Sequence, residues 1–276
     1  VFETSAFAEE QFFNGKGEND PAFSARDRIN RAPKSLGFVV LSPRISITPA
    51  GQALLTSKRK EEVFLRQMLK FQIPSPYHKP TAKAASFWVK PYLELLRLVR
   101  TMGTLKFDEL QIFGMQLTDW RNFENIVQKI EAFRIAKVEH QGSYKAFKAE
   151  YLRNELTRIF EERIMNGETQ TRESSDASLD KFLRTQSSNM RDYADACFRY
   201  LRATGLVNVS HVGKSLSIVP ERIEDVDYLL QTIDRSPCFI DNEKDYIEYL
   251  GNATVPQLLT DDRQKLVAKL HAEFPQ

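Results

Sequence analysis

The stretch Gly37–Leu55, GFVVLSPRISITPAGQALL, holds two short runs of alternating apolar residues, a turn between them, and the start of a helix. Phe38 and Val40 fall on one face of the first run, and Ile45 and Ile47 fall on one face of the second. Side chains alternate between the two faces of a strand, so this spacing predicts a two-stranded hairpin with an apolar packing face. The stretch therefore predicts a small β-wing that leads directly into a helix.

Turn and cap residues mark the ends of these elements. Ser42-Pro43-Arg44 has the composition of a tight turn. Thr48 caps the following helix, and Pro49 takes its first position, where a missing amide hydrogen costs no hydrogen bond. Before the hairpin, Pro33 opens a short helical turn that Gly37 ends. The predicted order is helix, short helix, wing, helix.

The same order of parts recurs at Gly205–Leu230, GLVNVSHVGKSLSIVPERIEDVDYLL, where Gly205 ends a helix and Pro220 starts the next one. The preceding helix carries an apolar stripe at helical spacing, made of Met190, Tyr193, Ala194, Cys197, Phe198 and Leu201. A helix, a two-stranded wing and a helix are typical of a winged helix-turn-helix unit, which reads a DNA groove and touches the DNA backbone. We therefore predict a mainly α fold with small β-wings, in the α+β class.

The pattern along the chain predicts four parts. An amphipathic helix is expected at 91–102, two further helices at 104–117 and 122–135, and one short helix within 261–276. The parts are a first winged-helix subdomain at 1–85, a helical middle at 86–165, a second winged-helix subdomain at 166–235 and an acidic helical tail at 236–276.

Composition narrows the class of protein. The 276 residues are 42% hydrophobic and 28% charged, as in a globular protein, and no apolar run is long enough for a membrane helix. Cys197 and Cys238 lie outside any metal-ligand spacing and, without a recognisable signal peptide, favour reduced thiols in the cytoplasm. The first residue is Val rather than Met, which suggests a piece of a longer chain.

The net charge of +2 hides an uneven distribution. Residues 1–106 carry 17 Lys and Arg against 9 Asp and Glu, residues 107–220 carry 16 against 16, and residues 221–276 carry 6 against 12. A basic front part favours an anionic partner, although solvated surface charge would give the same count.

Candidate DNA contacts lie on the helices that precede the two wings and in basic clusters nearby. Arg and Asn side chains can read guanine and adenine, whereas Lys and Ser suit phosphates. The candidates are Ser24, Arg26, Arg28, Asn30, Arg31, Lys34, Lys58, Arg59, Lys60, Lys79, Arg184, Gln186, Ser187, Asn189 and Arg191. Two alternatives to DNA contact remain. Part of the set from Arg26 to Arg31 could pair with Asp27 on the helix surface. Arg191, Asp195 and Arg199 are spaced four residues apart, which suits ion pairs on an exposed helix face.

Several segments in order along the chain resemble the N-terminal half of the AlwI-type restriction endonucleases. They are AFSARDRI, LGFVV, ISITPAGQALL, KRKEEVFLRQMLKFQIPSPYHKP, NMRDYADACFRYLRATGL and GNATVPQLL, and they cover most of residues 22–80 and 180–260. The resemblance implies a type IIS or nicking enzyme that binds a short asymmetric site in double-stranded DNA. It also implies winged-helix recognition subdomains followed by a separate Mg²⁺-dependent nuclease domain.

The nuclease half is expected to be missing from this chain. The sequence holds no Asp-x-Lys or Glu-x-Lys, and the residues after VPQLL predict only a short helix. The four histidines, His78, His140, His211 and His271, are isolated along the sequence. We therefore expect a chain without catalytic or metal-binding residues of its own, with no cofactor, that binds DNA as a monomer and does not cut it.

Two other classes of function remain open from the sequence. A winged-helix transcription regulator or replication initiator would use the same elements, and such regulators usually dimerise on a palindrome. A protein-interaction scaffold would use the wings without any nucleic acid.

Overall fold

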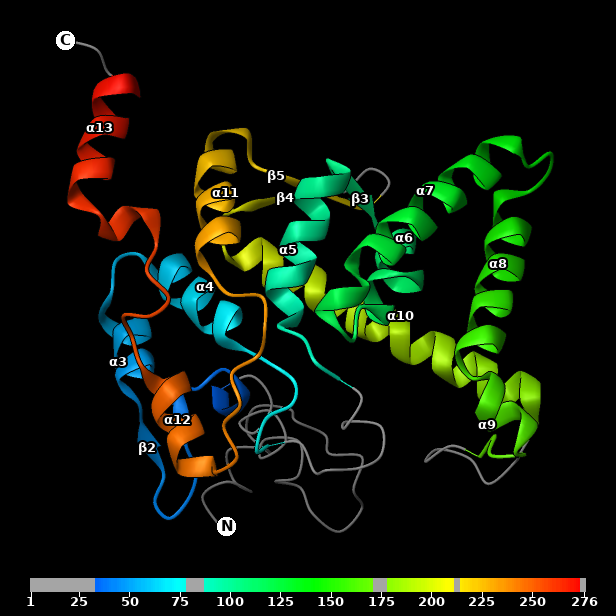
Figure 1. Cartoon of the computed structure of the whole chain (residues 1–276), viewed down its shortest axis with the longest axis horizontal. Coiled ribbons are helices and arrows are strands. Elements are labelled where there is room, and N and C mark those ends of the chain that lie inside the picture. Colours follow the sequence, from blue (N-terminus) through cyan, green and yellow to red (C-terminus); the bar gives the residue numbers. More distant parts are fainter. Residues whose placement is uncertain (1–32, 78–86, 171–177, 211–213, 274–276) are drawn as a thin grey trace, which may run out of the picture. The chain divides into compact units, whose positions relative to one another are not determined.

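The computed structural model describes residues 33–77, 87–170, 178–210 and 214–273, and it is mainly helical with two small antiparallel sheets (Figure 1). This agrees with the predicted α+β class. The chain forms two compact units: unit 1 comprises Val1–Lys90 and Ser236–Gln276, and unit 2 comprises Pro91–Arg235. Unit 2 is therefore inserted into unit 1. The division into four parts stays a prediction.

The hairpin of unit 1 forms where the sequence predicts it. Strands β1 (Val39–Val40) and β2 (Ser46–Ile47) pair antiparallel and lead into helix α3 (Pro49–Thr56). The side chain of Thr48 caps this helix, because its hydroxyl accepts a hydrogen bond from the Gly51 amide at 3.0 Å and donates to the Gly37 carbonyl at 2.6 Å. The predicted cap is confirmed.

The packing face predicted for the second strand is wrong. Ile45 and Ile47 are 80% and 54% exposed, whereas Phe38 on the other side of the hairpin is buried and stacks on Phe64. β2 is only two residues long and Ile45 precedes it, so alternation along that run is too short to direct both isoleucines inward.

The C-terminal part of the chain returns to pack in unit 1. Helix α4 (Lys60–Lys70) buries Val63, Leu65, Met68 and Leu69, as predicted. The end of α4 also reaches helix α12 (Glu243–Gly251): the Lys70 ammonium donates to the carbonyls of Leu250 at 2.8 Å and Asn252 at 2.5 Å. Burial and the neighbouring Arg66 guanidinium lower the pKa of Lys70 to about 7. A 3₁₀ turn, η6 (Leu259–Asp261), and helix α13 (Arg263–Glu273) complete the unit.

Unit 2 is built around a three-stranded sheet of order β3-β5-β4. Its elements in chain order are α5 (Pro91–Met102), β3 (Thr104–Lys106), α6 (Phe107–Ile112), η3 (Gly114–Gln116), η4 (Trp120–Asn122), α7 (Phe123–Glu139), α8 (Tyr144–Ile159), α9 (Glu161–Met165), α10 (Leu179–Ala203), β4 (Val207–Ser210), β5 (Ser215–Ile218), η5 (Pro220–Arg222) and α11 (Ile223–Thr232). The second predicted hairpin is thus formed by β4 and β5. It carries a third strand that local pattern did not predict.

That third strand corrects the expectation of one helix over 104–117. Leu105 of β3 lies opposite Leu216 of β5, and both side chains are fully buried. The helix begins only at Phe107, whose amide donates to the Lys214 carbonyl at 2.8 Å. Pairing with a strand about a hundred residues later overrides the local helical pattern here.

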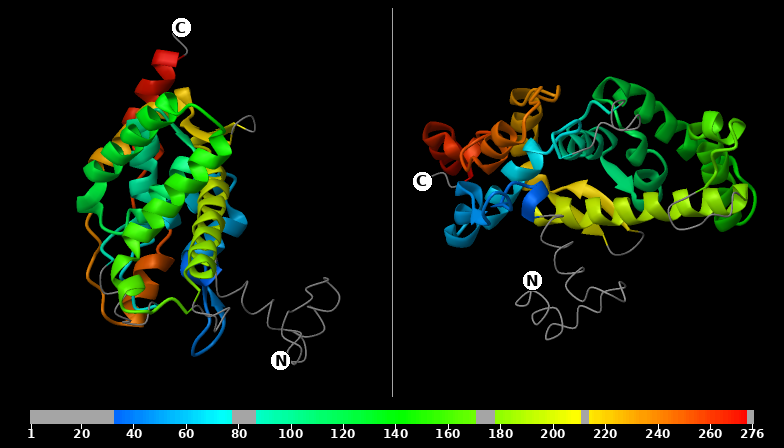
Figure 2. Two further views of the ribbon diagram at one scale, coloured as in Figure 1. Left: turned by 90° about the vertical axis from the view of Figure 1, so that its right-hand side faces the viewer. Right: turned by 90° about the horizontal axis from the view of Figure 1, so that it is seen from below.

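Helix α10 is a single long helix, seen lengthwise in the right-hand view of Figure 2. Its predicted stripe buries Ala194, Phe198 and Leu201, but Tyr193 is 67% exposed, so its predicted core position is wrong. Successive residues turn by about 100° around a helix, and Tyr193 therefore lies past the edge of the face that Ala194 occupies.

The two ends of unit 2 are tied together by a buried ion pair. The Arg235 guanidinium donates to both carboxylate oxygens of Glu94, at 2.9 and 2.7 Å, and Glu94 is fully buried. On the unit 1 side, the indole nitrogen of Trp88 donates to the Ser236 hydroxyl at 3.2 Å. At the insertion point, near residues 90 and 235, each unit therefore has its own bond between the two chain segments. Among the described residues, none of the helices has the length and apolar character to cross a bilayer.

Candidate nucleic-acid interface

One face of α10 carries a row of exposed polar side chains. Their spacing of three or four residues puts them on a single stripe of the helix. The row consists of Arg184, Ser188, Arg191, Asp195, Arg199 and Arg202, of which Ser188 is half-buried and the others are exposed. Four of its six members are arginines, so this face has a positive charge.

Ion pairs along this row are weak and local. Arg199 pairs with Asp195 at 3.1 Å, as the spacing predicted. Arg191 does not form the predicted pair with Asp195, which pairs with Arg199 instead. Its guanidinium lies 3.8 Å from the Asp192 carboxylate and 3.4 Å from the Ser188 hydroxyl. Exposed pairs of this kind contribute about 0–1 kcal/mol, so the arginines can change partners at little cost.

A groove of about 740 Å³ lies between α8 and α10 in unit 2, and we call it the α8/α10 groove. Leu152, Leu156 and Leu183 are buried and form its apolar part. Charged side chains line the rest. They are Lys145, Lys148, Glu150 and Arg153 from α8, and Asp180, Arg184 and Arg191 from α10.

The cations of the groove differ in their partners. Lys148 pairs with Asp108 of α6, and Arg153 pairs across the groove with Asp180 at 2.7 Å. Within the described part of the chain, neither Lys145 nor Arg184 forms an ion pair or hydrogen bond with another side chain. Five cations against two carboxylates leave the groove positive, with two cations available to an external anion.

Helix α6 holds both walls of the groove in place. The Tyr144 hydroxyl at the start of α8 donates to Asp108 at 2.6 Å, and burial together with this carboxylate raises the pKa of Tyr144. On the other wall, the Gln111 amide donates to the Ser187 carbonyl of α10 at 3.2 Å. The groove is therefore held by contacts from a third helix.

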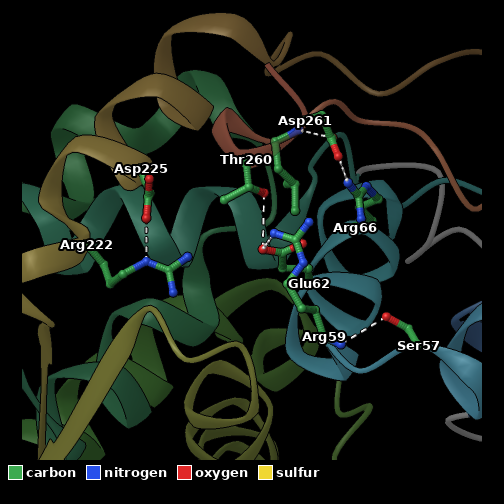
Figure 3. Close-up of polar contacts among 9 residues, drawn as sticks. Ser57, Arg59, Glu62, Arg66, Arg222, Asp225, Thr260 and Asp261 are labelled. Atoms are coloured by element: carbon green, nitrogen blue, oxygen red, sulfur yellow. Dashed lines mark hydrogen bonds and ion pairs between the residues drawn. The ribbon is translucent and has the colours of Figure 1, made fainter. Parts of the chain in front are cut away.

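Unit 1 presents a basic turn between α3 and α4. Lys58, Arg59 and Lys60 are all exposed, and Figure 3 shows how the region around Arg59 is held. The Arg59 amide donates to the Ser57 hydroxyl at 3.0 Å, and its guanidinium pairs with Glu62 at 2.8 Å. In the described part of the chain, Lys58 and Lys60 have no such partner.

Helix α4, which follows the basic turn, is bonded to the C-terminal segment of the chain. Glu62 also accepts a hydrogen bond from Thr260 at 3.1 Å, and Arg66 pairs with both carboxylate oxygens of Asp261 at 2.6 Å (Figure 3). The same figure draws the separate Arg222–Asp225 pair, which lies on η5 and α11 of unit 2.

The remaining predicted contacts fall into three groups. Lys34 already has partners, since it pairs with Glu243 at 3.4 Å and lies over the Tyr77 ring at 4.5 Å. On α10, Asn189 is exposed and Gln186 and Ser187 are half-buried. Six predicted contacts lie outside the described residues: Ser24, Arg26, Arg28, Asn30, Arg31 and Lys79.

Sequence reasoning missed the α8 wall of the groove. Lys145, Lys148 and Arg153 are spaced by three and five residues, so a count of basic residues along this helix would have indicated a cationic face. Within the described ranges, no group of three or more His, Cys, Asp or Glu side chains has the geometry to hold a metal ion.

Comparison with known proteins decides the family. The sequence model of the AlwI restriction endonuclease family matches residues 34–273. The chain belongs to the AlwI restriction endonuclease family. A search of curated protein sequences finds no match.

A solved structure has a similar fold to this AlwI-family chain. It is the crystal structure of pyrene- and phenanthrene-modified DNA in complex with the BpuJ1 endonuclease binding domain. The TM-score is 0.54 at 14% sequence identity, and the match covers 90% of this chain and 86% of that one. At this identity the likeness concerns the fold alone.

Proposed function

We propose that this AlwI-family chain recognises a short asymmetric site in double-stranded DNA, as the binding region of a type IIS restriction or nicking endonuclease. The observation that carries the proposal is the exposed arginine row on α10, on a helix that leads directly into the β4–β5 hairpin. A positive helix face of this length suits the major groove and its phosphates. The BpuJ1 binding domain, described in complex with DNA, supports the same partner.

We further propose that unit 2 acts as a winged helix. Its order α5, β3, α6, α10, β4, β5, interrupted by α7 to α9, matches that architecture, and α10 takes the position of the recognition helix. Asn189 and Arg191 are then the candidates for base contact and Arg184 is a candidate for phosphate contact, since all three are exposed on its N-terminal half. Residues 24–31 with the basic turn of unit 1 would form the second reading unit.

DNA cleavage is assigned to a Mg²⁺-dependent nuclease domain outside this chain. The lack of Asp-x-Lys and Glu-x-Lys in the sequence and the family membership support that division of labour. We propose that the protein is a cytoplasmic monomer that binds one asymmetric site. A transcription regulator with the same elements would instead form a dimer and select inverted repeats.

Selection of bound duplexes from a random pool, followed by sequencing, tests the proposal. One short asymmetric sequence should emerge, its affinity should fall steeply with salt, and the chain should leave the duplex intact in Mg²⁺. Equal affinity for all duplexes, selection of a palindrome by a dimer, or cleavage by this chain would each refute the corresponding part.

Substitutions then separate base contacts from phosphate contacts. Arg26→Ala or Arg28→Ala should cost about 1–3 kcal/mol and relax the base preference, if either reads a base. Lys60→Ala should weaken all sequences alike. Equal losses on every sequence from all three variants would show that the base readers lie elsewhere.

A further inference from the structure

The α8/α10 groove is positively charged overall and suits an external anion, yet it contains the carboxylate of Asp180. Asp180 lies in the first turn of α10, and its carboxylate accepts from the Arg153 guanidinium of α8 at 2.7 Å. The pair therefore spans the groove and joins its two walls. The side chains are 61% and 54% exposed, so solvent and ligands can reach both.

The surroundings of Asp180 are otherwise those of a phosphate site. Arg184 lies one turn further along α10 and lines the same groove. The hydrogen bond and charge of Arg153, and to a smaller extent the charge of Arg184, lower the pKa of Asp180. Lys145 on the opposite wall lines the groove as well. A carboxylate and a phosphate oxygen make the same charge-assisted hydrogen bonds to a guanidinium.

We propose that the α8/α10 groove binds a backbone phosphate of the bound DNA, and that Asp180 occupies this phosphate position until DNA displaces it. Arg153, Arg184 and Lys145 form the site. This inference rests on the proposed function, since it names one contact of the same DNA complex. It also assigns to Asp180 the role of an internal competitor that weakens binding to every duplex.

The competitor acts through two effects of similar size. Its negative charge repels an incoming phosphate, and a unit charge at roughly 6 Å in water changes affinity about threefold. The Asp180 carboxylate is also hydrogen-bonded to Arg153, and this bond must break before Arg153 can bind a phosphate. An exposed pair is weak, so this second effect is also no more than a few-fold.

Asp180→Asn is the direct test, with fluorescence anisotropy on a labelled duplex of mixed sequence over a range of salt. Affinity should rise about three- to tenfold at low salt, because the phosphate no longer has to displace a carboxylate, and the gain should shrink as salt screens the charge. Asp180→Glu should bind like the parent because it retains the charge. Glu124→Gln, an exposed change of the same charge on α7, is the matched control and should have less effect.

A second set of variants tests the phosphate site itself. Arg184→Ala and Lys145→Ala should each weaken all duplexes and reduce the salt slope by about 0.9, and Arg153→Gln should remove part of the gain from Asp180→Asn. Circular dichroism of each variant checks that α10 has kept its helix.

The outcomes separate this inference from the proposed function. If the parent binds no duplex, the proposed function fails. If the parent binds DNA but Asp180→Asn binds unchanged, more weakly, or no better than Glu124→Gln, the phosphate site in this groove is refuted. A gain confined to one DNA sequence would also refute it, because phosphate contacts do not depend on sequence.

Discussion

Replacing Glu94 with Gln should destabilise unit 2 more than any exposed charge change does. The carboxylate is fully buried on α5 and accepts two hydrogen bonds from Arg235, while Arg97 lies 3.9 Å away. Glu94→Gln keeps the size of the side chain but leaves Arg235 without its counterion. Breaking a buried pair in this way costs about 3–5 kcal/mol.

Partial exposure of the arginines reduces that figure. The side chains of Arg235 and Arg97 are 28% and 20% exposed, so water can partly solvate the charges that remain. Arg235 also keeps its contacts with the Trp120 ring, at 5.0 Å, and with the Trp120 carbonyl, at 3.2 Å. We therefore expect a loss of about 2–4 kcal/mol in the free energy of unfolding.

Urea unfolding followed by Trp fluorescence in a Trp88→Phe background measures this loss, because Trp120 then reports on unit 2. The midpoint should fall while the slope m stays unchanged. Asp195→Asn breaks the exposed Arg199 pair and should cost no more than about 0.5–1 kcal/mol. A Glu94→Gln loss no larger than that of Asp195→Asn would refute the assigned role of the buried pair.

Three further predictions concern packing and pH. Gly37→Ala should cost more than about 2 kcal/mol by thermal or urea unfolding, because Gly37 has φ +75° and an added Cβ would lie 2.5 Å from the Leu250 Cβ; a neutral result would contradict this contact. Phe198→Ala should cost about 3–5 kcal/mol and Tyr193→Ala much less, and equal losses would contradict the observed core face of α10. Stability should rise between about pH 7 and pH 10.5, because the unfolded chain holds a proton on Lys70 that the folded chain has lost; Lys70→Met should flatten this rise, and an unchanged profile would exclude Lys70 as its source.

Local signals allowed much of the helical framework to be predicted. The helix at 91–102 begins at a proline and ends before Gly103, which has φ +70°, and its bounds agree with the prediction. Thr48 and Pro49 likewise determine the start of α3 through a cap that involves only nearby residues. Such ends depend on side chains within one turn, so the sequence alone suffices to place them.

Features that depend on distant residues could not be predicted from local pattern. β3 exists because β5 pairs with it, and nothing within Thr104–Lys106 distinguishes a strand from the start of a helix. The α8/α10 groove has the same origin, since the Arg153–Asp180 pair joins two helices that are separate in sequence. The sequence indicated Arg184 and Arg191 on one wall, but only the fold brings Lys145 to the other.

The insertion of unit 2 into unit 1 has a consequence for synthesis and for engineering. On the ribosome, unit 2 is complete before Ser236 emerges, whereas unit 1 has to wait for its C-terminal segment to close the site around Lys70. The Trp88–Ser236 bond also keeps the two cut ends of unit 1 close to each other. A short linker at that point should therefore let unit 2 be removed, or exchanged like a cassette for that of a relative, without opening the rest of the fold.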